Sequence, residues 1–421
     1  MNDVYILGGA RTPMTEYVGA LRDLSALELG AIASRGAFEK TGVRPEWVEH
    51  VVFGNVMQTS ADAIYGARHV ALKAGVPIEV PALTVNRLCG SGIQAAITGA
   101  QHIQLGEAGI VLAGGMESMS QAPHVIRGAR TGLKLGQGKL EDTLYEALLD
   151  PMCGLFMAQT AEKCASNYGI SREEQDRYAL RSQQHADEAW RAWKFADEVV
   201  PVELPARGSM RRHPDAMRRD PDSMRGDPDR MRGGPSRSAT IIDRDDHLRP
   251  DTTLEALAKL PAAFSKEGTV TAGNASGIVD GGAALILAGE EAVKARSLKP
   301  IARLVAWAAV GVDPSIMGMG PAPAIRKVLE RAGLTLGDID LFEINEAFAG
   351  QYLAVEKELG LDRDRVNVNG GAIALGHPLG MSGTRLLLTL TLEMRRRGVR
   401  RGIASACIGG GQGIAALIEG I

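Results

Sequence analysis

The stretch FEKTGVRPEWVEHVVFGNVM, residues 38–57, has a counterpart later in the chain, LERAGLTLGDIDLFEINEAF, residues 329–348. In both, a helical segment ends in Glu, a basic residue, one further residue and Gly, and a short acidic link leads into an apolar strand. A looser match sets TVNRLCGSG (84–92) against NVNGGAIALGHP (367–378). Any two helix–strand units look alike over short windows, but two matches in the same order favour duplication. The sequence therefore predicts two similar α/β halves.

Apolar runs alternate with amphipathic stretches along the chain. Residues 4–9 read as a buried strand, and residues 25–42 read as a helix. Ser25 and Glu28 have the spacing of a capping box, and Gly42 stands where a helix commonly ends. This βαβ rhythm predicts a largely parallel sheet covered by helices.

The region 119–275 carries fewer strand signals. A second Ser-x-x-Glu box opens an amphipathic helix over 171–190, and four seven-residue repeats, from MRRHPDA to MRGGPSR, follow at 210–237. A proline in every repeat excludes a continuous helix. The repeats are predicted to form a flexible surface insertion; a binding arm for an anion or a partner is the alternative.

The composition excludes several classes of function. The chain has 421 residues, of which 45% are hydrophobic and 23% are charged, and a net charge of −3. This near-neutral balance argues against nucleic-acid binding and membrane-surface binding. No signal peptide and no apolar run long enough for a bilayer is visible. Four cysteines without a CxxC pair make a disulfide framework or a metal site unexpected, so we expect a cytoplasmic protein.

Cys89 lies in NRLCGSGIQ (86–94), at a predicted turn from a strand into a helix. The N-terminus of a helix favours a thiolate, and the glycines at 90 and 92 let other atoms approach the backbone. Both features suit a nucleophile, although a lone cysteine is more often a small buried hydrophobic residue.

Three other segments add polar groups at turns or strand ends. His377 lies in GHPLG (376–380), and Cys407 lies in SACIGGGQG (405–413), where glycine N–H groups suit an oxyanion hole. Asn345 follows an apolar run in EINEAFAG. Each segment is ambiguous alone. Together they supply two thiols, an imidazole and an amide, of the kind that gathers at the carboxyl edge of a parallel sheet.

NRLCGSG, NEAF, GHPLG and CIGGG, in this order, resemble the thiolase family. The likeness runs from ARTP (10–13) through GGMESMSQAP (114–123) and TAGNASG (271–277) to the C-terminus and leaves out only the seven-residue repeats. It implies a duplicated α/β fold with a layered αβαβα core and an inserted loop domain. The implied parts are an N-terminal half of residues 1–118 plus 278–298, a loop domain of residues 119–277 and a C-terminal half of residues 299–421.

The resemblance also implies an acyltransferase that works in two steps. Cys89, activated by His377, would attack a thioester or a 3-ketoacyl-CoA and become acylated, and Cys407 would handle the second proton. The outcome is thiolysis of 3-ketoacyl-CoA by CoA or condensation of acetyl-CoA to acetoacetyl-CoA. The N–H groups of Cys89 and Gly409 would hold one oxyanion. His377 and a water held by Asn345 would hold the enolate oxygen.

The substrates implied are CoA and acyl-CoA. By resemblance, Ser276 lies beside the pantetheine arm, Ala347 and Phe348 line its tunnel, and Arg249 meets the nucleotide end, where a surface charge is the alternative. Neither a metal nor a bound cofactor is implied. Thiolases of this type are usually dimers or tetramers, so a homodimer or homotetramer is expected.

The acyl-chain preference depends on LFMAQTAEKC (155–164). Thiolases restricted to acetoacetyl-CoA often have a His-Met pair here, whereas this chain has Phe156 and Met157. The resemblance therefore points to a broader range of 3-ketoacyl-CoA substrates. Cys153 and Cys164 match no catalytic motif and are predicted to be packing residues.

Two alternatives stay open at this point. A decarboxylating ketoacyl synthase shares the fold but normally has a second histidine where this chain has CIGGG. An inactive, thiolase-like binding protein would be expected to have lost Cys89, His377 or Cys407, and all three are present.

Overall fold

The computed structural model describes residues 3–204, 239–264 and 267–421. The seven-residue repeats predicted at 210–237 lie outside the described residues. The longer helices are α1 (Ala26–Thr41), α2 (Gly66–Lys73), α3 (Ser91–Gln104), α5 (Met157–Asn167), α6 (Arg172–Arg191), α9 (Pro321–Ala332), α10 (Ala349–Leu359) and α12 (Leu379–Arg397). The shorter helices are α4 (Thr143–Ala147), α7 (Leu254–Ala258), α8 (Glu290–Ala295) and α11 (Ala372–Leu375).

One large sheet runs through the molecule in the strand order β14-β15-β16-β13-β1-β12-β5-β3-β4. Its strands are β1 (Val4–Arg11), β3 (His50–Gly54), β4 (Ala82–Val85), β5 (Ile110–Glu117), β12 (Val279–Gly289), β13 (Ala302–Gly311), β14 (Leu341–Ile344), β15 (Arg401–Ile408) and β16 (Gln412–Gly420), and β2 (Thr15–Glu16) pairs with β12. Short hairpins are made by β6 (His124–Ile126) with β7 (Leu140–Asp142), by β8 (Leu149–Asp150) with β9 (Leu155–Phe156), and by β10 (Val202–Leu204) with β11 (Thr240–Ile242).

The prediction of a largely parallel sheet is wrong. Only β3 with β4, β3 with β5, and β14 with β15 pair in parallel, whereas β1, β12, β13 and β16 pair with their neighbours in the antiparallel sense. The reason lies in the connections. A short turn joins β15 to β16, and such a turn can only reverse the chain direction. The parallel strands of each half still end at the same edge.

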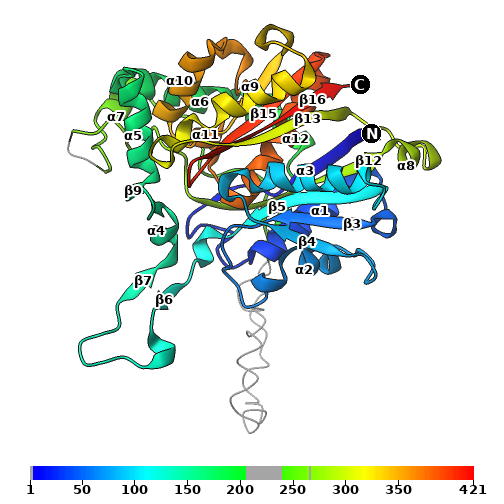
Figure 1. The fold of residues 1–421 in the computed structure, drawn as a ribbon, viewed down its shortest axis with the longest axis horizontal. Helices are drawn as coiled ribbons and strands as arrows, with labels where there is room; N and C mark the ends of the chain where they lie inside the picture. The colour runs from blue at the N-terminus through cyan, green and yellow to red at the C-terminus, as the bar shows by residue number, and fades with distance from the viewer. Residues whose placement is uncertain (1–2, 205–238, 265–266) are drawn as a thin grey trace.

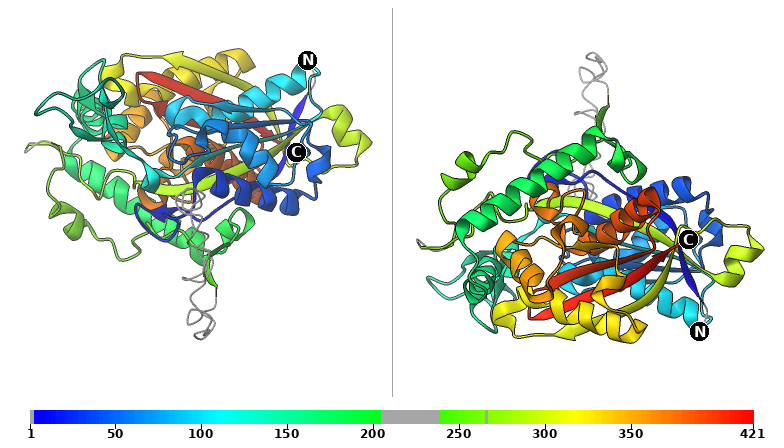
Figure 2. Two further views of the ribbon diagram at one scale, coloured as in Figure 1. Left: turned by 90° about the horizontal axis from the view of Figure 1, so that it is seen from below. Right: turned by 90° about the horizontal axis from the view of Figure 1, so that it is seen from above.

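Helices and sheet form five layers, which Figures 1 and 2 show from three directions. Helices α1 and α2 cover the outer face of the first half, and α9 and α10 cover the outer face of the second. Helices α3 and α12 pack against each other between the two halves of the sheet. The layered αβαβα core expected from the resemblance is therefore confirmed.

Local sequence signals fixed two of the helices as predicted. Helix α1 begins after Ser25, whose side chain accepts from the N–H of Glu28 in a full capping box, and it ends at Gly42 with φ of 69°. Helix α6 begins with the second predicted box, made by Ser171 and Glu174.

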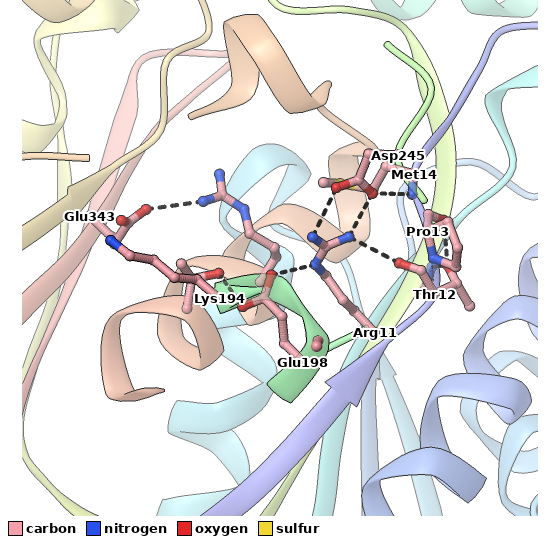
Figure 3. A network of polar contacts seen from close by, with 12 residues as sticks. Arg11, Thr12, Pro13, Met14, Lys194, Glu198, Asp245 and Glu343 are labelled. Carbon is pink, nitrogen blue, oxygen red and sulfur yellow. Dashed lines mark hydrogen bonds and ion pairs between the residues drawn. The ribbon is translucent and has the colours of Figure 1, made fainter. Parts of the chain in front are cut away.

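A buried ionic cluster ties the segment between β5 and β12 to the sheet, as Figure 3 shows. Arg11 at the end of β1 donates to both carboxylate oxygens of Asp245 (2.7 and 2.9 Å) and to Glu198 (2.6 Å). All three side chains are buried, so each charge depends on its partners for stabilisation. The hairpin of β6 and β7 extends away from the body of the molecule (Figure 1). In the described part of the chain, no helix combines the length and the apolar character needed to cross a bilayer.

Candidate active site

Cys89 lies in the turn that joins β4 to α3, where the sequence places it. One turn of 3₁₀ helix, Leu88–Gly90, carries Cys89, and α3 begins directly after it. Leu88 has a φ of 45°, in the left-handed region that side chains rarely occupy. The hydroxyl of Ser91 donates to the carbonyl of Leu88 (2.7 Å) and accepts from the N–H of Arg87 (2.8 Å). These bonds hold the turn in its strained form.

The thiol of Cys89 is half-buried. Burial raises the pKa of Cys89 to about 11, and the N–H groups of Gly409 and of Cys89 itself oppose that rise. The sequence predicts that the helix N-terminus favours the thiolate, whereas burial acts in the opposite direction. Attack by this sulfur therefore needs a base.

The turn between β15 and β16, residues 409–411, lies against the Cys89 turn. A Cβ added at Gly409 would lie 3.3 Å from Cδ1 of Leu88 and 3.3 Å from Sδ of Met157. The N–H of Gly409 also lowers the pKa of Cys89 by hydrogen bonding to its sulfur. The two predicted oxyanion donors, the N–H groups of Cys89 and Gly409, are thus brought together.

Cys407 is fully buried near the end of β15. Burial raises the pKa of Cys407 well above its ordinary value, and the thiols of Cys89 and Cys164 raise it further. Cys89 and Cys407 come from different halves of the chain, yet they lie within electrostatic reach of each other.

His377 is buried in the segment just before α12. Its Nδ1 lies 2.5 Å from Oγ of Ser382, and that hydroxyl donates to the carbonyl of Pro378 (2.9 Å). Because the hydroxyl has only one proton to donate, the network assigns the ring proton to Nδ1. Nε2 is then the acceptor, and Nδ2 of Asn345 donates to it (3.3 Å).

The imidazole of His377 is neutral over the physiological range. Burial, followed by the charge of Arg385, lowers the pKa of His377 to about 3. Arg385 is itself buried and lies 3.0 Å from the carboxyl group of Glu343. A neutral ring whose Nε2 is an acceptor can take a proton from a nearby thiol.

Asn345 directly follows β14, and its N–H donates to the carbonyl of Ser405 (2.9 Å) on β15. Within the part of the chain that the structure describes, Oδ1 of Asn345 is buried without a hydrogen-bond partner. The next residue, Glu346, accepts from the hydroxyls of Tyr178 (2.7 Å) and Ser182 (2.7 Å) on α6. The amide of Asn345 is thus held beside His377, and its Oδ1 atom can accept a hydrogen bond from a further group.

Apolar side chains that the resemblance assigns to the substrate tunnel gather around Cys407. They are Met157, Ala347 and Phe348, joined by Met317. Ser276 lies beside them, because its N–H donates to the carbonyl of Ala347 (3.0 Å). The N–H of His377 donates to the carbonyl of Gly277 (2.9 Å), so the segment that carries Ser276 and Gly277 also contacts the segment that carries His377.

Arg249 stands apart from this cluster. Its half-exposed side chain pairs with Glu16 and donates to the carbonyls of Asp246 (2.8 Å) and His247 (3.1 Å). His247 in turn packs against Gly277, where an added Cβ would lie 2.5 Å from the ring. Arg249 is therefore linked to the edge of the site through one intervening residue.

The comparisons with known families account for both halves of the chain. The model for the N-terminal domain of thiolase matches residues 4–225 and 230–291, and the model for the C-terminal domain matches residues 298–420. The chain belongs to the thiolase family. It is a mixed α/β thiolase of the acyltransferase type, as the resemblance implied.

Relatives of this thiolase align along its full length. The human mitochondrial 3-ketoacyl-CoA thiolase is 50% identical over 420 residues, which cover 100% of this chain and 98% of the relative. The acetyl-CoA acetyltransferase of Allochromatium vinosum is 44% identical and covers 100% of both chains.

Two solved structures are also similar to this thiolase. A crystal structure of human mitochondrial 3-ketoacyl-CoA thiolase in complex with CoA has a TM-score of 0.90 at 49% identity and covers 100% of this chain and 98% of that one. The Bacillus anthracis acetyl-CoA acetyltransferase has a TM-score of 0.91 at 43% identity, with 100% and 99% covered.

Sequence reasoning missed two residues that shape the site. Ser382 fixes the tautomer of His377, and Arg385 helps to keep the ring neutral. Both lie on α12 within eight residues of His377. No pattern singles out a serine or an arginine inside a helix, so only the contacts across the fold identify them.

Proposed function

We propose that this thiolase transfers acyl groups through a thioester on Cys89, with His377 as its base and Cys407 as the second acid and base. One observation carries the proposal. The thiols of Cys89 and Cys407, contributed by different halves, lie within electrostatic reach beside the N–H of Gly409. Covalent catalysis of this kind divides one difficult transfer into two easier steps.

In the first step of thiolysis, Sγ of Cys89 attacks the 3-keto carbon while its proton passes to Nε2 of His377. The bond between C2 and C3 breaks, the acyl group stays on Cys89, and Cys407 protonates the enolate of the leaving acetyl-CoA. In the second step, Cys407 takes the proton of the incoming CoA thiol, whose sulfur attacks the acyl carbon. The bond from that carbon to Sγ of Cys89 breaks, and Nε2 of His377 returns its proton to the released sulfur, so that acyl-CoA leaves a regenerated enzyme. Condensation of acetyl-CoA runs through the same steps in reverse.

Two sets of donors would stabilise the negative oxygens. The N–H groups of Cys89 and Gly409 suit the tetrahedral intermediate formed on Cys89. The unpartnered Oδ1 of Asn345 supports the proposal that this amide holds a water, which would donate to the enolate oxygen together with His377. One such donor is typically worth about 3 kcal/mol of transition-state stabilisation.

We further propose that CoA thioesters bind along the tunnel residues Met157, Ala347 and Phe348, with Ser276 beside the pantetheine arm and Arg249 near the nucleotide. No other bound cofactor is required. The ring of Phe156 contacts two aromatic neighbours, with its centroid 4.8 Å from that of Tyr145 in an edge-to-face arrangement and 5.9 Å from that of Phe264 in a tilted one. This apolar wall beside Met157 supports a range of acyl chains longer than acetoacetyl, and kcat/KM measured against chain length tests it.

The edge of the sheet supports an oligomer of identical chains. Strand β4 is the last strand of the sheet and exposes Leu83, and Ile64, Tyr65 and Ile78 are exposed nearby in sequence. An unpaired apolar edge can pair with the same edge of a second copy about a two-fold axis. We propose a homodimer on this edge or a homotetramer built from it, and a sedimentation mass equal to one chain would contradict this. A cytoplasmic location stays a prediction of the sequence.

Substitution of Cys89 tests the central proposal. Cys89→Ser should fold normally but form no acyl-enzyme with acetyl-CoA, because the hydroxyl is a far weaker nucleophile than the thiol at this site. The readout is the mass of the intact protein after incubation with acetyl-CoA, together with loss of the enolate absorbance of acetoacetyl-CoA. Cys153→Ser is the matched control, since Cys153 is also a half-buried free thiol and should leave acylation unchanged. Acylation of Cys89→Ser at the normal rate would refute the proposal.

A further inference from the structure

Glu117, the last residue of β5, is a fully buried carboxylate that the mechanism above does not use. Its Oε1 accepts from Nδ2 of Asn55 (3.0 Å) and from the N–H of Met57 (3.1 Å). Its Oε2 accepts from the N–H of Val56 (3.1 Å) and from the N–H of Gly380 (2.8 Å). Four donors from two distant segments thus meet on a single side chain.

The two segments held by Glu117 both border Cys89. Met57 follows β3, and its side chain packs in one cluster with Leu379 and Cys89. Leu379 precedes Gly380 and lies two residues after His377. The carboxylate therefore connects the wall around the nucleophile to the segment that carries the base.

The backbones meet at this point without room for a side chain. A Cβ added at Gly115 would lie 2.0 Å from the carbonyl oxygen of Gly380, and a Cβ added at Gly380 would lie 2.6 Å from the carbonyl oxygen of Met116. Close approach of β5 and the start of α12 places the N–H of Gly380 2.8 Å from Oε2 of Glu117. The close backbone approach at Gly115 on β5 and at Gly380 on α12 therefore fixes this contact.

We propose that Glu117 is a positioning residue of the acyl-transfer site, which fixes the His377 segment against the Cys89 turn through Gly380, Val56 and Met57. The inference rests on the proposed role of Cys89 as nucleophile. A displacement of about 1 Å between reacting groups commonly costs about a hundredfold in rate, and the carboxylate prevents such a displacement.

The charge of Glu117 gives this role a distinct signature. Burial raises the pKa of Glu117 to about 7, the N–H groups of Met57, Gly380 and Val56 oppose the rise, and Asp280 on β12 adds to it. In its charged form Glu117 raises the pKa of Cys89. Among the other titratable groups of the site, His377 lies just before α12 and is affected by the charge of Arg385 on that helix, and Cys407 on β15 is affected by Cys89.

Glu117→Gln removes this charge and turns one acceptor oxygen into a donor. We expect kcat for thiolysis to fall about 10- to 100-fold with KM unchanged within about threefold, because alignment is lost while the binding groups remain. The pH dependence of Cys89 alkylation by iodoacetamide, followed by peptide mass, should shift toward lower pH, since a nearby negative charge that raises the pKa of Cys89 is gone. Because unfolding would also expose Cys89 and speed its alkylation, this result supports the role of Glu117 only if the circular dichroism and the melting temperature of Glu117→Gln match those of the unsubstituted protein.

Glu198→Gln is the matched control. Glu198 is as buried as Glu117, but it accepts from Arg11 (2.6 Å) in the cluster of Figure 3 and from the hydroxyl of Thr389 (2.8 Å). It should lose thermal stability while kcat stays within about twofold and the Cys89 alkylation profile does not move. If Glu117→Gln does not fold, Asn55→Ala, which removes one of the four donors, should lower kcat about threefold to tenfold by the same route.

The outcomes separate this inference from the proposed function. Normal kcat and an unmoved alkylation profile in folded Glu117→Gln, with Cys89→Ser inactive, would overturn the role of Glu117 alone. Acylation of Cys89→Ser would overturn the proposed function itself, whatever Glu117→Gln does.

Discussion

The two halves of the chain place their strands in the same order but connect two equivalent strands by segments of very different length. The first half runs β1, β12, β5, β3 and β4 from the centre outward, and the second runs β13, β16, β15 and β14, with Val366 bridging to Phe342 where the first half has β4. In the first half, residues 118–278 separate β5 from β12. In the second, residues 409–411 suffice between β15 and β16. A large insertion and a three-residue turn therefore occupy equivalent places.

Each of the two helices of the middle layer, α3 and α12, follows one residue of the candidate site. Cys89 precedes α3 in the first half, and His377 precedes α12 in the second. The two helices cross at Gly92 and Gly383, where an added Cβ would lie 2.3 Å from the N atom of Thr384 or 2.4 Å from that of Ile93. Cys89 and His377 thus lie at equivalent helix starts, while the end of β15 carries Cys407 and the short turn after it carries Gly409.

The largest expected effect concerns Cys407, the cysteine of the second half. Cys407→Ala should still form the acyl-enzyme from acetyl-CoA, since Cys89 and His377 remain, but carbon–carbon bond formation should fall about a thousandfold without a group to move the second proton. Intact mass reports acylation, and the rate of acetoacetyl-CoA synthesis reports condensation. Cys164→Ala is the control, because Cys164 is equally buried and should condense at nearly the normal rate. Condensation by Cys407→Ala at the normal rate would show that the role given to Cys407 is wrong.

The helix crossing gives the next effect. Gly92→Ala and Gly383→Ala should each lower the free energy of unfolding by about 3 kcal/mol, because a methyl group placed against the facing backbone forces α3 and α12 apart. Chemical denaturation measures both. Gly337→Ala should change it by less than about 0.5 kcal/mol, since its added Cβ would find its nearest atom at 3.7 Å. Unequal losses at Gly92 and Gly383 would break the equivalence of the two helices.

A smaller effect is expected at the partner of the base. Ser382→Ala removes the acceptor of the Nδ1 proton of His377, so the ring can adopt the other tautomer, and kcat should fall about tenfold with little change in KM. Steady-state kinetics across pH provide the measurement. Ser34→Ala is the control, because Ser34 is also a buried helical serine that donates to a backbone carbonyl, that of Gly30 (2.7 Å), but it lies in α1. Equal kcat values for the two variants would show that Ser382 does not orient the His377 ring.

The smallest effect is expected in the insertion, which has no counterpart in the second half. Arg249→Ala should raise KM for CoA about threefold to tenfold with kcat unchanged, because an exposed arginine contributes binding to the nucleotide end and no chemistry. Initial rates at varied CoA concentration test this. Arg44→Ala, at an exposed arginine paired with Glu46 in the first half, should leave KM unchanged. An unchanged KM in Arg249→Ala would assign Arg249 to its ion pair with Glu16 alone.

Much of the architecture was predictable because local signals and the repeat agree. Ser25, Gly42 and Ser171 mark helix ends by short-range hydrogen bonding, which the structure confirms. The direction of the strands was not predictable in this way, since an apolar run reads the same in a parallel or an antiparallel pair. The sheet became mixed because a glycine turn and a long insertion replace two of the crossovers that a parallel sheet needs.

The sequence by itself determined the family, the duplicated frame and the residues Cys89, His377, Cys407 and Asn345, because these lie in motifs whose letters are contiguous in the chain. Only the tertiary structure decided their charges and their supports. Burial between segments from both halves raises the pKa of Cys89 to about 11 and, with the charge of Arg385, lowers the pKa of His377 to about 3. Ser382 and Glu117 acquire their places through contacts between segments that fold together from opposite ends of the chain.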